Sequence, residues 1–266
     1  MARRRLTAEQ EPYLVARALS TTYSGGSCLH PHKHASHQLL FAASGAMTVT
    51  GDCTTWMIPP GRAVLIPAGV LHSIRMWGDV AMRSLYFPPA AAAPGRPEGL
   101  QPRTVFEICR VISVSSLLRE LILRVAELAA LDSRDESDAR LMGVLMDELA
   151  IAHVEPLLLP LPSDARALAA ANDVLARPGA DATTDDVAKR AGLSARTLER
   201  LFRAETGMTF GLWRQKARLL ESVRVLAEGQ SVTDAALEAG YSSVSAYIAA
   251  FKQTFGRTPG AMLTLG

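Results

Sequence analysis

The chain of 266 residues is 48% hydrophobic and 20% charged, with a formal net charge of +2. This composition excludes global disorder and a strongly polycationic protein, so any binding to nucleic acid must depend on locally placed basic side chains. Three scattered cysteines without a CxxC pair, and the absence of any run of about 18 apolar residues, predict a cytoplasmic protein without disulfides or membrane spans.

Residues 35–88 contain several short stretches in which apolar and polar residues alternate, each bounded by Gly, Pro or Asp. Short strands so closely spaced predict a sandwich or a barrel. A segment rich in Pro, Gly and Ala follows at 89–102 and predicts a linker. We therefore expect an N-terminal barrel domain over residues 1–100.

Residues 101–160 change to a helical period after a possible strand around 103–111. Two amphipathic helices are expected within 113–154, the first with an apolar stripe from Leu117 to Leu128. We predict that they form the dimerisation and linker region of a homodimer. The alternative is that they pack on the barrel of their own chain. A connector at 155–165 leads out of this region, and it is expected to be extended because it contains Pro160 and Pro162.

Residues 161–266 form a predicted C-terminal domain with an internal repeat. Ala188 lies four residues before Gly192, and Ala236 lies four residues before Gly240. The small alanine lets two helices cross closely, and the glycine supplies a backbone angle that a side chain resists. The pattern predicts two helix-turn-helix motifs joined by one helix, and such a pair predicts DNA binding. The motifs are expected at 184–205 and 231–255.

The second helix of the first motif turns long polar side chains away from its apolar residues. Arginine can bind guanine O6 and N7, and glutamate can accept from cytosine N4, so Arg196, Glu199 and Arg200 are predicted to read bases. Arg203 is predicted to touch a phosphate. The alternative is a solvated charged face. The full set expected at DNA from this motif is Ser194, Arg196, Thr197, Glu199, Arg200 and Arg203.

The matching helix of the second motif offers few hydrogen-bonding side chains, and Ala249 stands where the first helix has Arg200. We therefore predict that the first helix dominates base specificity. The second is expected to sense thymine methyl groups or DNA shape, with Lys252 and Arg257 as anchors. The set expected at DNA from this motif is Ser243, Val244, Ser245, Ala249 and Lys252.

Residues 164–265 resemble the DNA-binding domain of the AraC/XylS family of bacterial transcription regulators, through AGLSARTLERLFRAETGMTF, WRQKARLL and AGYSSVSAYIAAFKQTFGRTP. The resemblance implies two recognition helices in successive major grooves of double-stranded DNA. The stretches HQLLFAASGAMTVT and PPGRAVLIPAGVLHSIRM resemble a subset of that family with a cupin-like N-terminal domain.

The resemblance implies an α+β fold class: a cupin-like β-barrel, a helical dimerisation and linker region, and an all-α domain with two helix-turn-helix motifs. It also implies a regulator that responds to a small-molecule effector, forms a homodimer and contacts RNA polymerase. Whether it activates or represses transcription stays open.

The histidines near the N-terminus form a second candidate site. His32 and His34 make an HxH pair, Gln38 follows, and His72 ends a G-x5-P-x-G-x2-H pattern. The spacing resembles the two cupin motifs, whose metal ligands would map to His32, His34, Gln38 and His72. Three imidazoles with one oxygen suit Zn, Ni, Fe or Mn. Gln38 departs from the acidic residue of that pattern and weakens the ligand set.

Two other interpretations of these residues stay open. They can line a pocket for the effector, or hydrogen-bond within the barrel without a ligand. We assign no catalytic residue. The rival hypothesis is a metal-dependent cupin enzyme with an accessory helical domain, and a third is a helical adaptor that binds protein. Further strand residues that can face a ligand are Trp56, Arg75, Arg83 and Tyr86.

Overall fold

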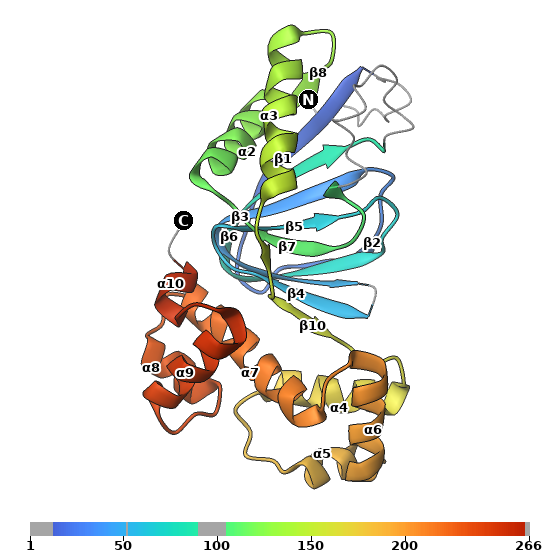
Figure 1. The fold of residues 1–266 in the computed structure, drawn as a ribbon, viewed down its shortest axis with the longest axis vertical. Helices are drawn as coiled ribbons and strands as arrows, with labels where there is room; N and C mark the ends of the chain where they lie inside the picture. Colours follow the sequence, from blue (N-terminus) through green and yellow to red (C-terminus); the bar gives the residue numbers. More distant parts are fainter. Residues whose placement is uncertain (1–12, 52, 90–104, 264–266) are drawn as a thin grey trace.

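A computed structural model describes residues 13–51, 53–89 and 105–263. The chain forms an N-terminal antiparallel sheet domain, two helices packed against it, and a C-terminal all-α domain (Figure 1). This confirms the predicted α+β class. The linker expected at 89–102 lies, apart from its first residue, outside the described residues. Within the described residues no helix is both long and apolar enough to cross a membrane.

The N-terminal domain is built on a sheet of ten strands. The strands are β1 Leu14–Tyr23, β2 Cys28–His32, β3 His37–Gly51, β4 Thr54–Ile58, β5 Arg62–Ile66, β6 His72–Phe87, β7 Arg110–Ser113, β8 Ala130–Asp132, β9 Val154–Glu155 and β10 Leu158–Pro160. The last four lie in the region expected to be mainly helical, so that region completes the sheet. The strand expected around 103–111 begins only at Arg110.

The two long strands β3 and β6 pair with each other along their length, and the two halves of each strand pair with different neighbours. The first half of β3 pairs with β5 and its second half with β4, while β6 pairs with β1 in one half and β2 in the other. Gly45 lies at the bend with φ +70°. A Cβ there would lie 2.5 Å from the carbonyl oxygen of Asp79, so the bend requires glycine.

Both faces of β3 are buried in its first half, which explains the nearly continuous apolar stretch there. Leu39 and Phe41 belong to a core shared with the two helices that cover the sheet. Leu40 and Ala42 belong to a second core, which continues from the inside of the sheet domain into the C-terminal helices. The sheet domain and the C-terminal domain are therefore packed on each other.

Two helices, α2 Ser116–Leu128 and α3 Glu136–Ile151, cover the outer face of the sheet (Figure 1). The apolar stripe expected on α2 divides into two faces. Leu118, Ile122 and Val125 are buried against the sheet, whereas Leu117 and Leu128 are exposed. The helices thus pack on their own chain and still present apolar side chains to the outside.

The C-terminal domain contains only helices in its described part. They are α4 Ala165–Ala176, α5 Thr184–Arg190, α6 Ala195–Thr206, α7 Phe210–Ala227, α8 Val232–Glu238, α9 Val244–Phe255 and α10 Pro259–Leu263. Helices α5 and α6 form the first predicted motif, α8 and α9 form the second, and α7 joins them. The connector pairs with the sheet through β9 and β10 before α4 begins.

Candidate DNA interface and ligand site

The first helix-turn-helix motif has the geometry that its sequence predicts. Ala188 on α5 is completely buried, and Gly192 in the turn has φ +68°. The side chain of Ser194 accepts a hydrogen bond from the backbone N–H of Thr197 and so caps the start of α6. Local sequence is therefore sufficient to begin the recognition helix at Ala195.

The second motif repeats these features. Ala236 is buried, Gly240 has φ +76°, and Ser231 forms a capping box with Asp234 at the start of α8. Tyr247 on α9 is completely buried, and burial raises its pKa to about 12. The two units thus share one architecture.

Helix α7 joins the motifs and carries the centre of the C-terminal core. Phe210 and Trp213 are completely buried and pack with Phe202 of α6. Leu212, which lies between them in sequence, is instead 56% exposed. The indole N–H of Trp213 donates to the carbonyl oxygen of Pro160 in the connector at 2.6 Å.

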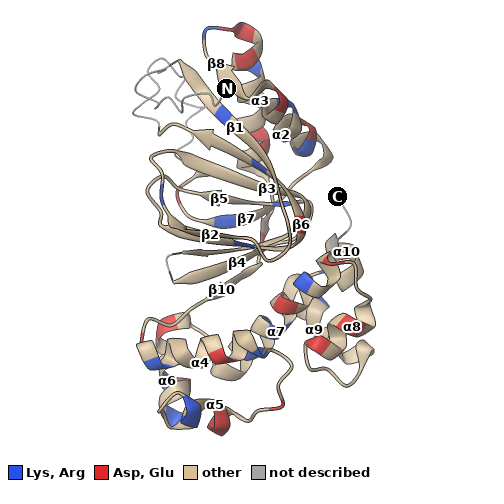
Figure 2. Cartoon of the chain, turned by 180° about the vertical axis from the view of Figure 1, so that it is seen from behind, with Lys and Arg blue, Asp and Glu red and all other residues tan. Residues whose placement is uncertain are grey.

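The exposed face of α6 is basic. Arg196, Arg200 and Arg203 are all exposed, as a DNA-reading role requires, and Figure 2 shows basic residues gathered on α6 at the end of the molecule farthest from the sheet. Thr197 is half-buried, and its hydroxyl lies 2.8 Å from that of Ser194. This face can meet phosphates and base edges.

Glu199 was expected to accept from cytosine, but it has a hydrogen-bond partner within the protein. Its carboxylate accepts a hydrogen bond of 3.1 Å from the backbone N–H of Phe210, at the start of α7. A carboxylate at a helix N-terminus satisfies an unpaired amide and interacts favourably with the helix dipole. The structure therefore gives Glu199 a role within the protein, and its contact with cytosine stays a prediction.

The exposed face of α9 carries little hydrogen-bonding capacity. Ser245, Ala249 and Lys252 are exposed and Val244 is half-buried. The side chain of Ser243 accepts from the N–H of Ala246 and caps α9. Arg257, expected to anchor this helix on a phosphate, lies instead 3.3 Å from the carboxylate of Glu155 in β9. In this arrangement the guanidinium is paired within the protein, and its contact with DNA stays a prediction.

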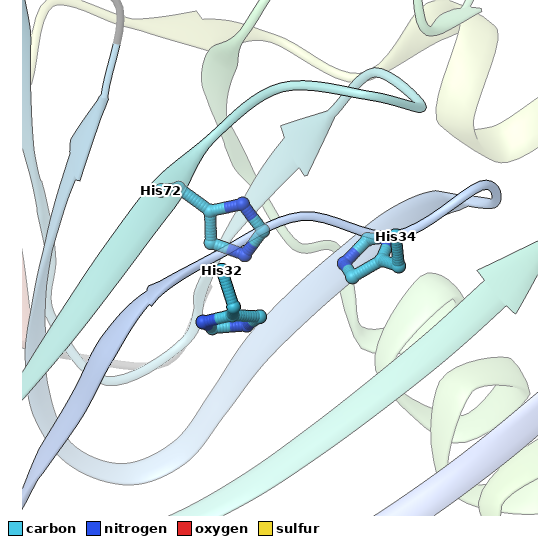
Figure 3. Close-up of side chains that lie close together, drawn as sticks. All are labelled: His32, His34 and His72. Carbon is cyan, nitrogen blue, oxygen red and sulfur yellow. The ribbon is translucent and has the colours of Figure 1, made fainter.

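The histidine site is formed where β2 meets β6. His32 ends β2 and pairs with His72 at the start of β6, and His34 follows in the next loop. Figure 3 shows the three rings close together, and one ring nitrogen from each lies within 4.8 Å of the other two. Burial lowers the pKa of His72, which favours its neutral form.

Hydrogen bonds decide which nitrogen of each ring faces inward. Nδ1 lies 2.7 Å from a backbone carbonyl oxygen in His32 and in His34, and 3.0 Å from one in His72. A carbonyl only accepts, so each Nδ1 carries a proton, and a neutral ring then keeps its lone pair on Nε2. Among the described residues, the Nε2 atom of His72 is buried and has no hydrogen-bond partner.

Gln38 joins the histidines from β3. Its Oε1 lies 2.9 Å from Nε2 of His34, and its amide nitrogen donates to the hydroxyls of Ser84 and Tyr86. The fourth residue of the predicted cluster is therefore in place. Of the further candidates only Tyr86 meets the site. Trp56 is buried elsewhere in the core, Arg75 stacks over Trp77, and Arg83 donates to the carbonyl of Met82.

The sequence also matches known families on both sides of the connector. Residues 16–147 match an AraC-like ligand binding domain, and residues 187–264 match a helix-turn-helix domain. The regulator NimR of Escherichia coli K12 is 33% identical over 229 residues, which cover 86% of this chain and 80% of NimR. This chain belongs to the AraC/XylS family of transcription regulators.

Other relatives of this AraC/XylS protein are regulators too. The transcriptional activator NphR of a Rhodococcus species is 29% identical over 225 residues, covering 81% of this chain and 66% of NphR. Among solved structures, the DNA-binding domain of AdpA in complex with DNA is 27% identical, covers 37% of this chain and 89% of that one, and has a TM-score of 0.35. The matched families, NimR and NphR give no support to the rival enzyme hypothesis.

The predictions from sequence missed the charged residues that fix the connector on each side of this regulator. Glu155 is only 1% exposed and lies 3.0 Å from Nε of the buried Arg62. The carboxylate of Glu205 on α6 accepts from the backbone N–H groups of Ser163 and Asp164 at the end of the connector. A signal was present, because a charged residue inside an apolar stretch, such as Arg62 before AVLI, implies a buried partner.

Proposed function

We propose that this regulator is a cytoplasmic homodimer whose sheet domain senses a small-molecule effector and whose α6 dominates operator recognition. The observation that carries the proposal is the contrast between the two recognition helices. Three exposed arginines lie on α6, whereas α9 presents Ser245, Ala249 and Lys252 at its surface. Bidentate arginine contacts distinguish guanine from the other bases, and small side chains do not.

Selection of bound fragments from a random DNA pool tests this division. Arg200→Ala is expected to relax the preference at one base pair, with a loss of about 1–3 kcal/mol in discrimination there. Arg140→Ala is the matched control, because Arg140 is equally exposed but lies on α3, away from the proposed interface. An unchanged preference in Arg200→Ala would refute readout by α6.

The dimer in this proposal is formed by α2 and α3. Leu117 on α2 is 52% exposed, and Val144 and Ile151 on α3 are 44% and 77% exposed. Apolar side chains that are left on the outer face of a helix pair favour contact with a second copy.

The proposal also includes RNA polymerase as a partner of the protein on DNA. It is supported by the similarity to NphR, whose name describes an activator.

The effector site of the proposal is the cluster of His32, His34, His72 and Gln38, and it includes a divalent transition metal. The donor set fits such an ion: one ring nitrogen from each histidine lies within 4.8 Å of the other two, each Nδ1 is held by a backbone carbonyl, and Nε2 of His72 lacks another partner in the described structure. Imidazole nitrogens with one amide oxygen suit Zn, Ni or Fe. A bound ion would supply a fixed positive charge for an anionic effector group.

The amide of Gln38 allows an arrangement without a metal. If its oxygen and nitrogen exchanged places, the nitrogen would donate to Nε2 of His34 and the oxygen would accept from Ser84 and Tyr86. That arrangement corresponds to an ordinary polar pocket. Titration of the protein with a metal ion distinguishes the arrangement with a metal from the arrangement without one.

A further inference from the structure

Three charged side chains from separate segments meet between the domains. Glu155 of β9 lies 3.0 Å from Nε of Arg62 at the start of β5, and 3.3 Å from Nη2 of Arg257 in the turn between α9 and α10. We call this group the ion triad. It joins the sheet domain, the connector and the second helix-turn-helix motif, whose helices α8, α9 and α10 lie below and to the left of the sheet domain in Figure 1.

The two ion pairs of the triad are unequal. The side chains of Arg62 and Glu155 are 2% and 1% exposed, so neither charge is stable there without the other. The side chain of Arg257 is 35% exposed. Arg257 can therefore leave Glu155 and enter water, while Arg62 and Glu155 stay paired. The contact that holds the second motif is the one that can open.

The surroundings leave room for such opening. A hollow of about 290 Å³ lies beside the triad and is lined by Arg62, His153 and Arg257, among others. A close-packed core resists movement of one side chain, whereas a hollow at its edge does not. The hollow therefore offers space into which the side chain of Arg257 can move when its pair with Glu155 opens.

A single strand connects the triad to the effector site. Strand β5 begins at Arg62 and ends at Ile66, and Ile66 pairs with Gln38 in β3. All residues of β5 are buried. A displacement of Gln38 can therefore reach Arg62 of the triad through the single buried strand β5.

We infer that Arg257 is a positioning residue, whose ion pair with Glu155 holds the second helix-turn-helix motif on the sheet domain and releases it when the pair opens. The inference deepens the proposed function and rests on it for the presence of a DNA site. It replaces the expectation that Arg257 binds a phosphate. The state of the sheet domain then acts on α9 and α10 through this exchangeable contact, while the shared apolar core keeps the two domains packed on each other.

The salt dependence of DNA binding tests the role of Arg257. Loss of one phosphate contact lowers the slope of log affinity against log salt by about 0.9. We expect Lys252→Gln, on the exposed face of α9, to lower the slope by that amount. Arg257→Gln is expected to leave the slope unchanged. An equal decrease of the slope in both variants would overturn the inference.

Hydrogen exchange gives a second readout that needs no DNA. Arg257→Gln is expected to reduce the protection of backbone amides in α9 and α10, because the motif is no longer held on the sheet domain. Lys252→Gln is expected to leave that protection unchanged. Unchanged protection in Arg257→Gln would also overturn the inference. If the unaltered protein fails to bind any DNA, the proposed function fails, and this measurement still decides the role of Arg257.

Discussion

The phenol oxygen of Tyr247 in the second recognition helix lies 2.9 Å from the hydroxyl oxygen of Ser222 in α7, and both residues are completely buried. Ser222 donates its own hydrogen to the carbonyl of Leu219. The phenol must therefore be the donor in the pair. This bond fixes α9 to the helix that joins the two motifs.

The direction of this bond makes its two partners unequal. Ser222→Ala leaves a buried phenol O–H without an acceptor, so we expect a loss of about 1–3 kcal/mol in the free energy of unfolding. Tyr247→Phe leaves only an unused acceptor, so we expect a loss of about 0.5–1.5 kcal/mol. Urea denaturation of both variants measures the difference. A larger loss in Tyr247→Phe would mean that the donor was assigned wrongly.

The raised pKa of Tyr247 predicts a loss of stability in alkali. Its pKa is about 12 in the folded protein against a reference value of 10.0. The folded state therefore retains the proton longer than the unfolded state, and this contribution is complete below pH 10 and is lost as the pH rises to about 12. We expect Tyr247→Phe to gain stability relative to the unaltered protein across this window. Parallel curves of unfolding free energy against pH would contradict the assignment.

The bond from Phe210 to Glu199 predicts that Glu199 supports the fold more than DNA specificity. Glu199→Ala removes an acceptor at the start of α7, so we expect a loss of about 0.5–2 kcal/mol in stability, as for other helix caps. The preferred operator sequence is expected to stay the same. Thermal unfolding and fragment selection measure the two effects, and a changed preference at a cytosine would restore the original interpretation.

The poor hydrogen-bonding capacity of α9 makes Ala249 dispensable for specificity. Ala249→Gly removes one exposed methyl group, and we expect a loss of about 1 kcal/mol in stability from the lower helix propensity of glycine. Base preference is expected to change little. A large loss of specificity in fragment selection would refute the dominance of α6.

The histidine cluster predicts metal binding by the full chain. Titration with Co²⁺ or Zn²⁺, using protein without an affinity tag, is expected to give one bound ion per chain. His32→Ala removes a ligand, so we expect the affinity to fall by more than about 100-fold, beyond the effect of losing an outer partner. His30→Ala is the control, because His30 is exposed and stands outside the cluster. Absence of binding, or equal losses in both variants, would favour the site without a metal.

Much of the fold follows from local patterns. The pairs Ala188 with Gly192 and Ala236 with Gly240 predict both motifs, because a close helix crossing and a left-handed turn are decided by residues that are near each other in sequence. The spacing of the HxH pair and His72 also predicts their convergence, although they come from different strands. The bases that α6 and α9 read remain predictions.

The amino-acid pattern alone was sufficient to predict two recognition units, a sheet domain with a histidine cluster, and the family. The contact of Glu199 with the start of α7 and the pair of Arg257 with Glu155 became evident only from the folded chain. The partner of a charged side chain depends on how distant segments pack. Arg257 and Glu155 belong to different domains, and no local pattern specifies that they meet. A propensity acts within a few residues, whereas an ion pair between domains exists only once both domains have folded and docked.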